Sequence, residues 1–334
     1  MRPPPKASGV IQRKSSGHPR VFYYLILLML GAGCAARPHL PQSVSPSDLR
    51  REISVRSIRS DGLNGDFFQR TSDKPQRALI LLGGSEGGKS WSDHTERIGE
   101  FVDQGYCVLS LAYFGADGLQ TRLRGVPLEY FAKAFHWLST QEKVVPNDYA
   151  VLGVSRGAEL ALLLGSRYPE VRTVIAIAPS SVVFPGPPTG ILDALHGLHS
   201  AWSFGGKEVA FVPIPYSWTT LRGMITGKRT RMFEKALQKT QAVDAASIRV
   251  ENTQGPILFV SFSRDQVWPS TLMSSQLVQR LRDHGFPFQY EHVDYDTTHS
   301  NWSIEPCWAK ILAFLRGQAS PGAPMAGSFR QRHG

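Results

Sequence analysis

The chain has 334 residues, enough for one large α/β domain with a substantial core or for two small domains, and 42% of the residues are hydrophobic. Its formal net charge is +10, but the first 33 residues carry five basic residues and no acidic ones, so this short segment holds half of the excess. Because the remaining basic residues are interleaved with acidic ones and form no stripe with aromatic residues, the sequence argues against a nucleic-acid partner.

The N-terminus has the features of a targeting segment. Its basic stretch is followed by the apolar run "VFYYLILLMLGAG", about 13 residues long, which is too short for a comfortable membrane span and right for a signal peptide. The run ends in small residues directly before Cys34, which resembles the bacterial lipobox, although Gly31 stands where leucine is usual. We predict a signal segment over 1–33, lipidation of Cys34, membrane association through the N-terminus and a location at the bacterial cell envelope facing the periplasm. Secretion, an uncleaved anchor and a cytoplasmic protein are the alternatives.

Residues 34–50 include a Pro- and Ser-rich stretch and are expected to form a tether. Beyond the tether, apolar runs predict strands at 77–84, 106–115, 149–154, 171–180, 256–263 and 288–295. Helices are predicted at 128–138, from Gly157 onward, at 274–285 and at 305–317. This alternation predicts an α/β domain over 51–317, with a doubly wound, mostly parallel sheet and helices on both faces, and a disordered tail over 318–334.

One segment interrupts the alternation. Residues 186–250 are rich in glycine and proline and contain a basic stretch, and they lie between the strands predicted at 171–180 and 256–263. In sheets of this kind an insertion at this point often covers the active site. We therefore expect a cap-like insertion at about 186–250.

A serine stands between two glycines in "GVSRG", where the strand predicted at 149–154 passes into a helix. A serine hydroxyl needs a base to take its proton and a third group to hold that base. In α/β-hydrolases the three follow in the order serine, acid, histidine. Ser155, Asp265 and His299 have this order, and each follows a predicted strand, so their side chains are expected to converge at the carboxyl edge of the sheet. The sequence thus predicts an α/β-hydrolase with a catalytic triad.

Alternatives exist for two members of this triad. Asp265 also fits a helix N-cap or a solvated loop acid, and His299 a surface histidine. The rival His292 lies within a predicted strand instead of after it, while Asp294 and Asp296 lie close to the histidine in sequence. Order and spacing favour Asp265 and His299.

Acyl transfer also needs hydrogen-bond donors for the oxygen that becomes negatively charged. One is expected to be the backbone N–H of Arg156, and the other the N–H of Ser85 in the glycine-rich "LGGSEGG". A phosphate-binding loop is the alternative, because Gly83 to Ser90 fits the pattern G-x-x-x-x-G-K-[ST], but that interpretation would leave the serine, acid and histidine unexplained. We therefore expect an oxyanion hole at this loop.

The three cysteines form no pattern typical of a metal site or a disulfide framework. If Cys34 is lipidated, Cys107 and Cys307 remain, and Cys107 lies inside an apolar run. It is interpreted as a buried small hydrophobe. No metal-ligand spacing occurs elsewhere, and no cofactor is predicted.

Longer stretches carry a family resemblance. They are "LGGSEGG", "LAYFG", "PLEYFAKAFHWLS", "LGVSRGAELALLLGSRYPEV", "VIAIAPSSVVFPG", "SAWSFGGKEVAFVPIP" and "GPILFVSFSRDQVWPS". The chain resembles the C-terminal catalytic domain shared by bile acid-CoA:amino acid N-acyltransferases and acyl-CoA thioesterases, and the resemblance implies that Ser155, Asp265 and His299 are its nucleophile, acid and histidine. Two departures are visible: too few residues precede the first core strand for the N-terminal β-sandwich of the long relatives, and "TTHSNW" replaces their "AGH".

The resemblance implies a serine hydrolase that cleaves acyl thioesters, as acyl-CoA thioesterases do, through an acyl-enzyme. Relatives that transfer acyl groups to amines tend to use cysteine, whereas a serine acyl-enzyme is an oxyester that favours water as the acceptor. The expected partner is a small acyl ester or thioester. The alternatives are an envelope carboxylesterase resembling dienelactone hydrolases or serine peptidases, an acyltransferase of the same family, and a binding lipoprotein without catalysis.

Overall fold

The computed structural model describes residues 53–187, 198–214, 226 and 229–318. The predicted signal segment, Cys34, the predicted tether and the tail after Gln318 lie outside these residues. Within the described ranges, none of the helices combines the length and the apolar character that crossing a membrane requires.

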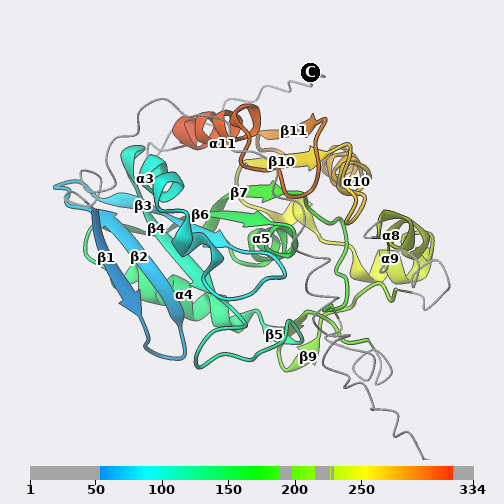
Figure 1. The fold of residues 1–334 in the computed structure, drawn as a ribbon, viewed down its shortest axis with the longest axis horizontal. Helices are drawn as coiled ribbons and strands as arrows, with labels where there is room; N and C mark the ends of the chain where they lie inside the picture. Colours follow the sequence, from blue (N-terminus) through cyan, green and yellow to red (C-terminus); the bar gives the residue numbers. More distant parts are fainter. Residues whose placement is uncertain (1–52, 188–197, 215–225, 227–228, 319–334) are drawn as a thin grey trace, which may run out of the picture. The chain divides into compact units, whose positions relative to one another are not determined.

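A sheet of eight strands forms the centre of the described fold (Figure 1). Its order is β1-β2-β4-β3-β6-β7-β10-β11. The pairs β1–β2 and β2–β4 are antiparallel, and every other neighbouring pair is parallel. The strands are β1 (Ile53–Ile58), β2 (Asn64–Arg70), β3 (Gln76–Leu82), β4 (Tyr106–Ala112), β6 (Val144–Val154), β7 (Val171–Ile177), β10 (Ile257–Phe262) and β11 (Tyr290–Tyr295).

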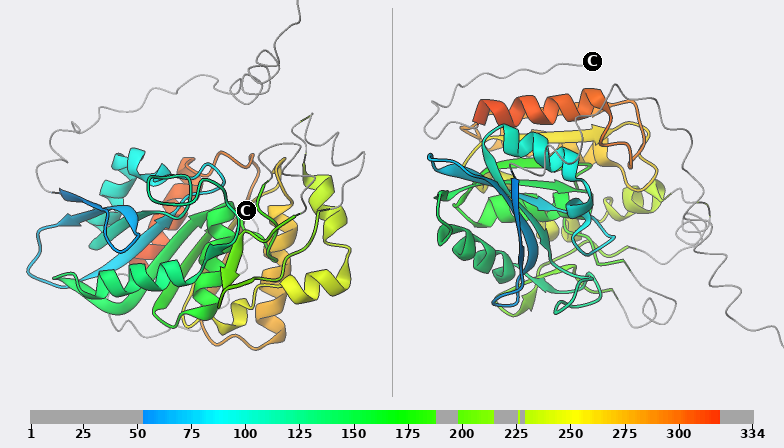
Figure 2. Two further views of the ribbon diagram at one scale, coloured as in Figure 1. Left: turned by 90° about the horizontal axis from the view of Figure 1, so that it is seen from below. Right: turned by 60° about the vertical axis from the view of Figure 1, so that its left-hand side comes forward.

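Side chains of the central strands alternate between two layers of helices. Along β3, Ala78 and Ile80 belong to one core cluster, and Leu79 and Leu81 belong to the other. The first cluster includes apolar residues of α4 (Glu129–Ser139), α5 (Arg156–Arg167) and α10 (Ser270–Asp283). The second includes those of α3 (Thr95–Asp103) and α11 (Glu305–Gln318), and Figure 2 shows α4 and α11 on opposite sides of the sheet. Because both faces are buried, the strands read as continuous apolar runs.

The fold predicted from the sequence is confirmed, with additions at the N-terminal side. Each predicted strand and helix is present, with ends shifted by a few residues. Strands β1 and β2 and helix α3 are elements that the sequence did not predict. Four of the six residues of β1 are exposed, and in its sequence ISVRSI the alternation of Ile53 and Val55 with polar residues ends before Ile58, so the pattern is too short to mark a strand.

The predicted insertion lies between β7 and β10. Its described elements are β8 (Trp202–Phe204), β9 (Lys207–Glu208), α8 (Thr230–Ala236), α9 (Thr240–Ala246) and the short 3₁₀ helix η2 (Val250–Asn252). Strand β8 pairs in parallel with β5 (Val126–Pro127) and antiparallel with β9, in a separate small sheet. A third apolar cluster, with Phe184, Phe233 and Trp268 at its centre, packs α8 against the chain that follows β10. The insertion therefore contacts the rest of the domain in two places, through β8 against β5 and through α8 against Trp268.

Candidate active site

Ser155 lies in the sharp turn between β6 and α5. Its φ of +57° and ψ of −115° are a backbone conformation that residues other than glycine rarely adopt. The two flanking glycines are required by close packing: a Cβ on Gly153 would lie 1.9 Å from the carbonyl oxygen of Gly157, and a Cβ on Gly157 would lie 2.3 Å from that of Gly83. The G-x-S-x-G motif is thus explained by a strained turn that presents the serine at the carboxyl end of β6.

The structure brings Ser155, His299 and Asp265 together. His299 Nε2 lies 2.9 Å from Ser155 Oγ, and His299 Nδ1 lies 2.8 Å from Asp265 Oδ2. Each residue follows the carboxyl end of a parallel strand: β6, β11 and β10, respectively. The three side chains therefore form one continuous chain of hydrogen bonds, arranged so that the imidazole can take a proton from the serine hydroxyl.

Asp265 is held from several sides. Its carboxylate accepts hydrogen bonds from Ser270 Oγ at 2.7 Å and from the backbone N–H groups of Val267 at 2.9 Å and Trp268 at 3.2 Å. Its side chain is 2% exposed, so the interpretation of Asp265 as a solvated loop acid is wrong. The N-cap of α10 is Pro269, which also removes the simple capping role.

The alternative candidates for the histidine and the acid form hydrogen bonds and ion pairs with other residues. His292 contacts Ser261 Oγ at 2.8 Å, and Asp294 accepts a hydrogen bond from Thr271 Oγ1 at 2.6 Å. Asp296 forms an exposed ion pair with Arg264 at 2.9 Å. The first two contacts lie between β10, β11 and α10, and the third joins the loops after β10 and β11, so none of them involves the Ser155 hydroxyl.

The glycine-rich loop after β3 lies beside Ser155. Gly84, Ser85 and Glu86 line the same cavity as Ser155 and His299, and Ser85 is exposed at it. Lys89 does not face a phosphate site, because its ammonium group forms an ion pair with Asp66 at 2.6 Å. The phosphate-loop alternative is therefore weakened, and the loop is placed to contribute backbone donors near the serine.

Tyr113 fixes the conformation of this loop. Its hydroxyl group donates to the carbonyl oxygen of Gly83 at 2.6 Å and lies 3.2 Å from that of Gly84. Burial raises the pKa of the Tyr113 phenol well above its ordinary value of 10.0, and the charge of Glu86 raises it further. The phenol therefore stays protonated and remains a donor. Tyr113 belongs to the stretch "LAYFG", which contributes to the family resemblance, but no sequence pattern assigns this tyrosine a role.

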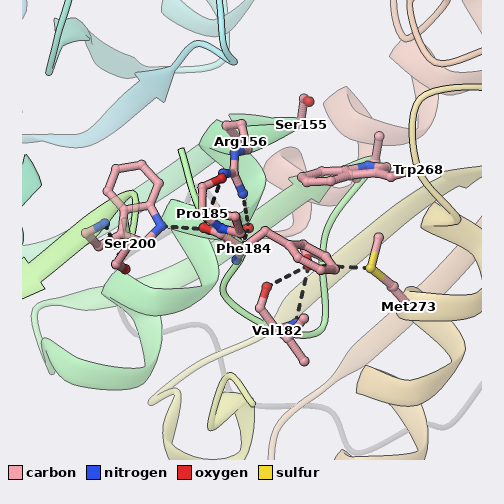
Figure 3. A network of polar contacts seen from close by, with 12 residues as sticks. Ser155, Arg156, Val182, Phe184, Pro185, Ser200, Trp268 and Met273 are labelled. Carbon is pink, nitrogen blue, oxygen red and sulfur yellow. Dashed lines mark hydrogen bonds and ion pairs between the residues drawn. The ribbon is translucent and has the colours of Figure 1, made fainter. Parts of the chain in front are cut away.

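Arg156 takes part in two ways. As the first residue of α5, it has a backbone N–H outside the hydrogen-bond ladder of the helix, next to the serine. Its guanidinium group points away into the protein, where it bonds Glu159 Oε2 at 2.7 Å and the carbonyl oxygens of Phe184 and Pro185 (Figure 3). The side chain is thus structural, while the N–H faces the turn.

Glu159 closes this buried network. Its side chain is fully buried, and its Oε1 accepts a hydrogen bond from Trp202 Nε1 at 2.7 Å. Burial raises the pKa of Glu159, although Arg156 and the Trp202 bond act in the opposite direction. The network ties the insertion, through Trp202, to the helix that carries the serine. Neither Glu159 nor Trp202 has a local sequence signal that would have revealed the contact.

A cavity of about 420 Å³ opens beside the triad. Trp91 and Trp302 form one wall, with ring centres 4.8 Å apart, and His94 packs against Trp302 at 5.5 Å. Arg229, from the predicted insertion, also lines the cavity, so the insertion does reach the site. A space of this size with an aromatic wall and a few polar groups is typical of a small-molecule site.

Two remaining sequence expectations concern thiols and metals. Cys107 is fully buried and unpaired, which confirms its interpretation as a buried small hydrophobe, and Cys307 is buried as well. Burial raises the pKa of both thiols to about 12. Across the residues that the structure places, no group of three or more His, Cys, Asp or Glu residues is arranged to hold a metal ion.

Comparison with known proteins bears on these observations. The sequence profile of the family described as "BAAT / Acyl-CoA thioester hydrolase C terminal" matches residues 126–309, more than half of the chain. The matched range includes Ser155, Asp265 and His299. The family resemblance inferred from the sequence motifs is therefore confirmed.

Individual relatives are similar at low identity. The chain is 26% identical over 234 residues to acyl-coenzyme A amino acid N-acyltransferase 2 of Rattus norvegicus. It is 25% identical over 239 residues to peroxisomal succinyl-coenzyme A thioesterase and 24% over 237 residues to acyl-coenzyme A thioesterase 1, both of Mus musculus. Each match covers 70% of this chain and 50–51% of the relative. The chain thus spans about half the length of the relatives that it matches.

Solved structures share the architecture. An esterase of Pyrococcus furiosus superposes with a TM-score of 0.52 at 17% identity, covering 84% of this chain and 98% of the esterase. An acylaminoacyl peptidase of Pyrococcus horikoshii gives a TM-score of 0.56 at 10% identity, covering 84% of this chain and 44% of the peptidase. At these identities the likeness concerns the fold alone, which is that of the α/β-hydrolases.

Proposed function

The chain belongs to the BAAT / acyl-CoA thioester hydrolase C-terminal family, and on that premise we propose that it is a serine hydrolase that cleaves acyl thioesters. One observation carries the proposal: the hydrogen-bonded chain from Ser155 Oγ through His299 to Asp265, at 2.9 and 2.8 Å. A protein that had kept the fold only to bind a ligand would have no need for this geometry, so the binding-protein alternative is disfavoured.

The geometry supports a two-step reaction. Ser155 Oγ attacks the carbonyl carbon of the thioester while His299 Nε2 takes the hydroxyl proton, and Asp265 holds the imidazole in the tautomer that this transfer requires. The carbonyl oxygen becomes an oxyanion, for which the N–H of Arg156 and the loop after β3 supply donors. The carbon–sulfur bond then breaks, and His299 gives its proton to the departing thiolate. Water attacks the acyl-Ser155 ester by the same route and releases the acid.

Water is the proposed acyl acceptor because the nucleophile is serine. An acyl-serine is an oxyester, which amines attack less readily than the thioester of an acyl-cysteine. The relatives include an N-acyltransferase and thioesterases by name, so family membership alone leaves transfer and hydrolysis open. The serine at position 155 favours hydrolysis. A carboxylesterase with the same triad is the second candidate, since the same attack cleaves an oxygen ester.

Two measurements test this function together. A fluorophosphonate probe should label the wild-type protein rapidly at Ser155, because only an activated serine reacts quickly with it. Initial rates should then be compared for a panel of acyl-CoA thioesters, free amines as acyl acceptors, and p-nitrophenyl esters of matched chain length. Preference for thioesters with release of free acid supports the proposal. Failure of the folded protein to label overturns the hydrolase reading, and N-acyl amine as the main product overturns hydrolysis.

We further propose that the enzyme works at a bacterial cell envelope, anchored by a lipid on Cys34. The motive is the apolar run and the small residues before Cys34, which lie outside the described residues. Since acyl-CoA is a cytoplasmic metabolite, an envelope location favours an acyl ester or a thioester of another thiol as the natural substrate. Location therefore bears directly on the identity of the leaving group.

A further inference from the structure

A carboxylate occupies the loop that lies beside the candidate nucleophile. The backbone N–H of Gly84 donates a hydrogen bond to Glu86 Oε1 at 2.7 Å. The Glu86 side chain therefore folds back over its own loop, although the residue is exposed to solvent. This contact uses a backbone donor at the place where the proposed reaction needs one.

The direction of this donor is set by Tyr113. Its hydroxyl group holds the carbonyl oxygen of Gly83 at 2.6 Å, on the buried side of the loop. In a trans peptide the N–H points opposite to the C=O, so the N–H of Gly84 points away from Tyr113. It points instead to the Glu86 carboxylate, and Gly84, Glu86 and Ser155 all line the cavity.

The donor and the carboxylate are both close to Ser155. A Cβ placed on Gly84 would lie 3.4 Å from the Cβ of Ser155 and 2.9 Å from Glu86 Oε2. The short distance to Glu86 Oε2 shows how closely the carboxylate lies to Gly84, and the far end of this flexible side chain is free to move aside. The Glu86 carboxylate thus lies over Gly84 at the edge of the space in which a substrate carbonyl would be attacked.

We propose that the N–H of Gly84 is a donor of the oxyanion hole and that Glu86 occupies it in the substrate-free enzyme. This inference rests on the proposed function. A carboxylate oxygen and the oxyanion of a tetrahedral intermediate present the same kind of acceptor, and the single hydrogen of Gly84 cannot bond both well. As charge develops on the substrate oxygen, the Glu86 carboxylate is displaced into solvent, where water hydrates it. Glu86 thereby keeps the loop in its donor conformation and competes with the transition state.

A ligand that becomes an oxyanion only after binding tests this competition. An aliphatic trifluoromethyl ketone accepts Ser155 Oγ at its carbonyl carbon, the carbonyl π pair moves to oxygen, and the serine proton passes to His299. The dissociation constant of this adduct should be about tenfold lower in Glu86→Ala than in the wild type, or about 1.4 kcal/mol. Glu86→Gln keeps an acceptor oxygen without the charge and should give a smaller gain. Glu96→Gln changes an exposed carboxylate of α3, two residues after the cavity-lining His94, so it controls for removal of charge alone and should change the constant less than twofold.

The possible results separate the two proposals. Equal or weaker affinity in folded Glu86→Ala overturns the inference and leaves the hydrolase intact. Failure of the wild type to form the adduct, with Ser155→Ala behaving identically, overturns the proposed function and the inference with it. A structure of the wild-type adduct gives an independent test that needs no variant. Glu86 Oε1 should have left Gly84 N, with the adduct oxygen in its place, and retention of the original bond would be decisive against the inference.

Discussion

The guanidinium group of Arg156 lies 5.8 Å from the centre of the Trp268 ring, so the residue after the candidate nucleophile contacts the residue three positions after the candidate acid. The Trp268 ring in turn packs edge-on against the His299 ring at 6.1 Å. Its Nε1–H donates to the carbonyl oxygen of Ala178 at 3.1 Å. The Trp268 ring therefore contacts both the turn after β6 and the histidine loop after β11, and it links them to its own loop after β10.

Ser155→Ala should lower kcat for the best substrate of the panel by about 10³-fold or more, because the variant has no nucleophile for the imidazole to activate. The fold should be preserved, since alanine is smaller and the hydroxyl bonds only His299 among the contacts described for it. Thermal unfolding and circular dichroism verify the fold, and steady-state kinetics give the loss. Near-wild-type turnover in the folded variant would contradict the role of Ser155.

Asp265→Asn should lower kcat by up to about 10⁴-fold, because an amide in place of the carboxylate favours the wrong tautomer of His299. The matched control is Asp294→Asn, whose carboxylate bonds Ser261 of β10 and Thr271 of α10 instead of His299. It should keep activity within about threefold. If the control is the more damaging change, the acid has been misassigned.

Glu159→Gln should reduce the free energy of unfolding by about 3 kcal/mol, because it leaves the buried Arg156 guanidinium without its counter-charge. Glu208→Gln provides the contrast. It removes a carboxylate that is 45% exposed and pairs with His199, so the change should be below about 1 kcal/mol. Urea denaturation of the two variants measures both values. Equal losses in the free energy of unfolding would contradict a greater stabilisation by the buried Arg156–Glu159 pair than by the exposed His199–Glu208 pair.

The Glu251 pair should make stability depend on pH. Burial raises the pKa of Glu251, but the hydrogen bonds and charge of Arg280 outweigh it and hold that pKa below the ordinary value of 4.5. A lowered folded-state pKa means that the stabilisation is fully present above pH 4.5 and disappears as the pH falls through the lower, folded value.

Glu251→Gln should therefore be less stable than the wild type by about 1–3 kcal/mol near neutral pH, with the difference shrinking below pH 4.5. Urea unfolding of both proteins at a series of pH values checks this. A difference that stays constant down to the acid limit would contradict the assignment of the pair.

Cys34→Ser should abolish lipid attachment and move the protein from the membrane fraction to the soluble fraction of the envelope. The reason is that the proposed thioether-linked lipid needs the Cys34 sulfur. Mass spectrometry of the native N-terminus decides the matter. A diacylated Cys34 supports the envelope location, whereas an intact Met1, or a free N-terminus beyond residue 34, rules out the lipoprotein. An intact Met1 on a soluble cytoplasmic protein would also restore acyl-CoA as a natural substrate.

The sequence alone determined the architecture and the positions of three candidate catalytic residues. Parallel strands that are buried on both faces read as continuous apolar runs, and their carboxyl ends meet at one edge of the sheet. The order of Ser155, Asp265 and His299 along the chain therefore already implied that they converge. Gly153 and Gly157 carried the same kind of local signal, because backbone packing at this turn leaves no room for a Cβ.

Tertiary structure alone decided which groups support that site. Tyr113 reaches the loop 30 residues before it, Trp202 reaches Glu159 across 43 residues, and the Glu86 carboxylate turns back onto Gly84. Nothing in the local sequence marks these contacts, since each depends on where the sheet, the insertion and the loops come together in space. A periodic pattern reports which face of an element is buried, whereas the partner of a single polar side chain is set by packing between elements that are distant in the chain.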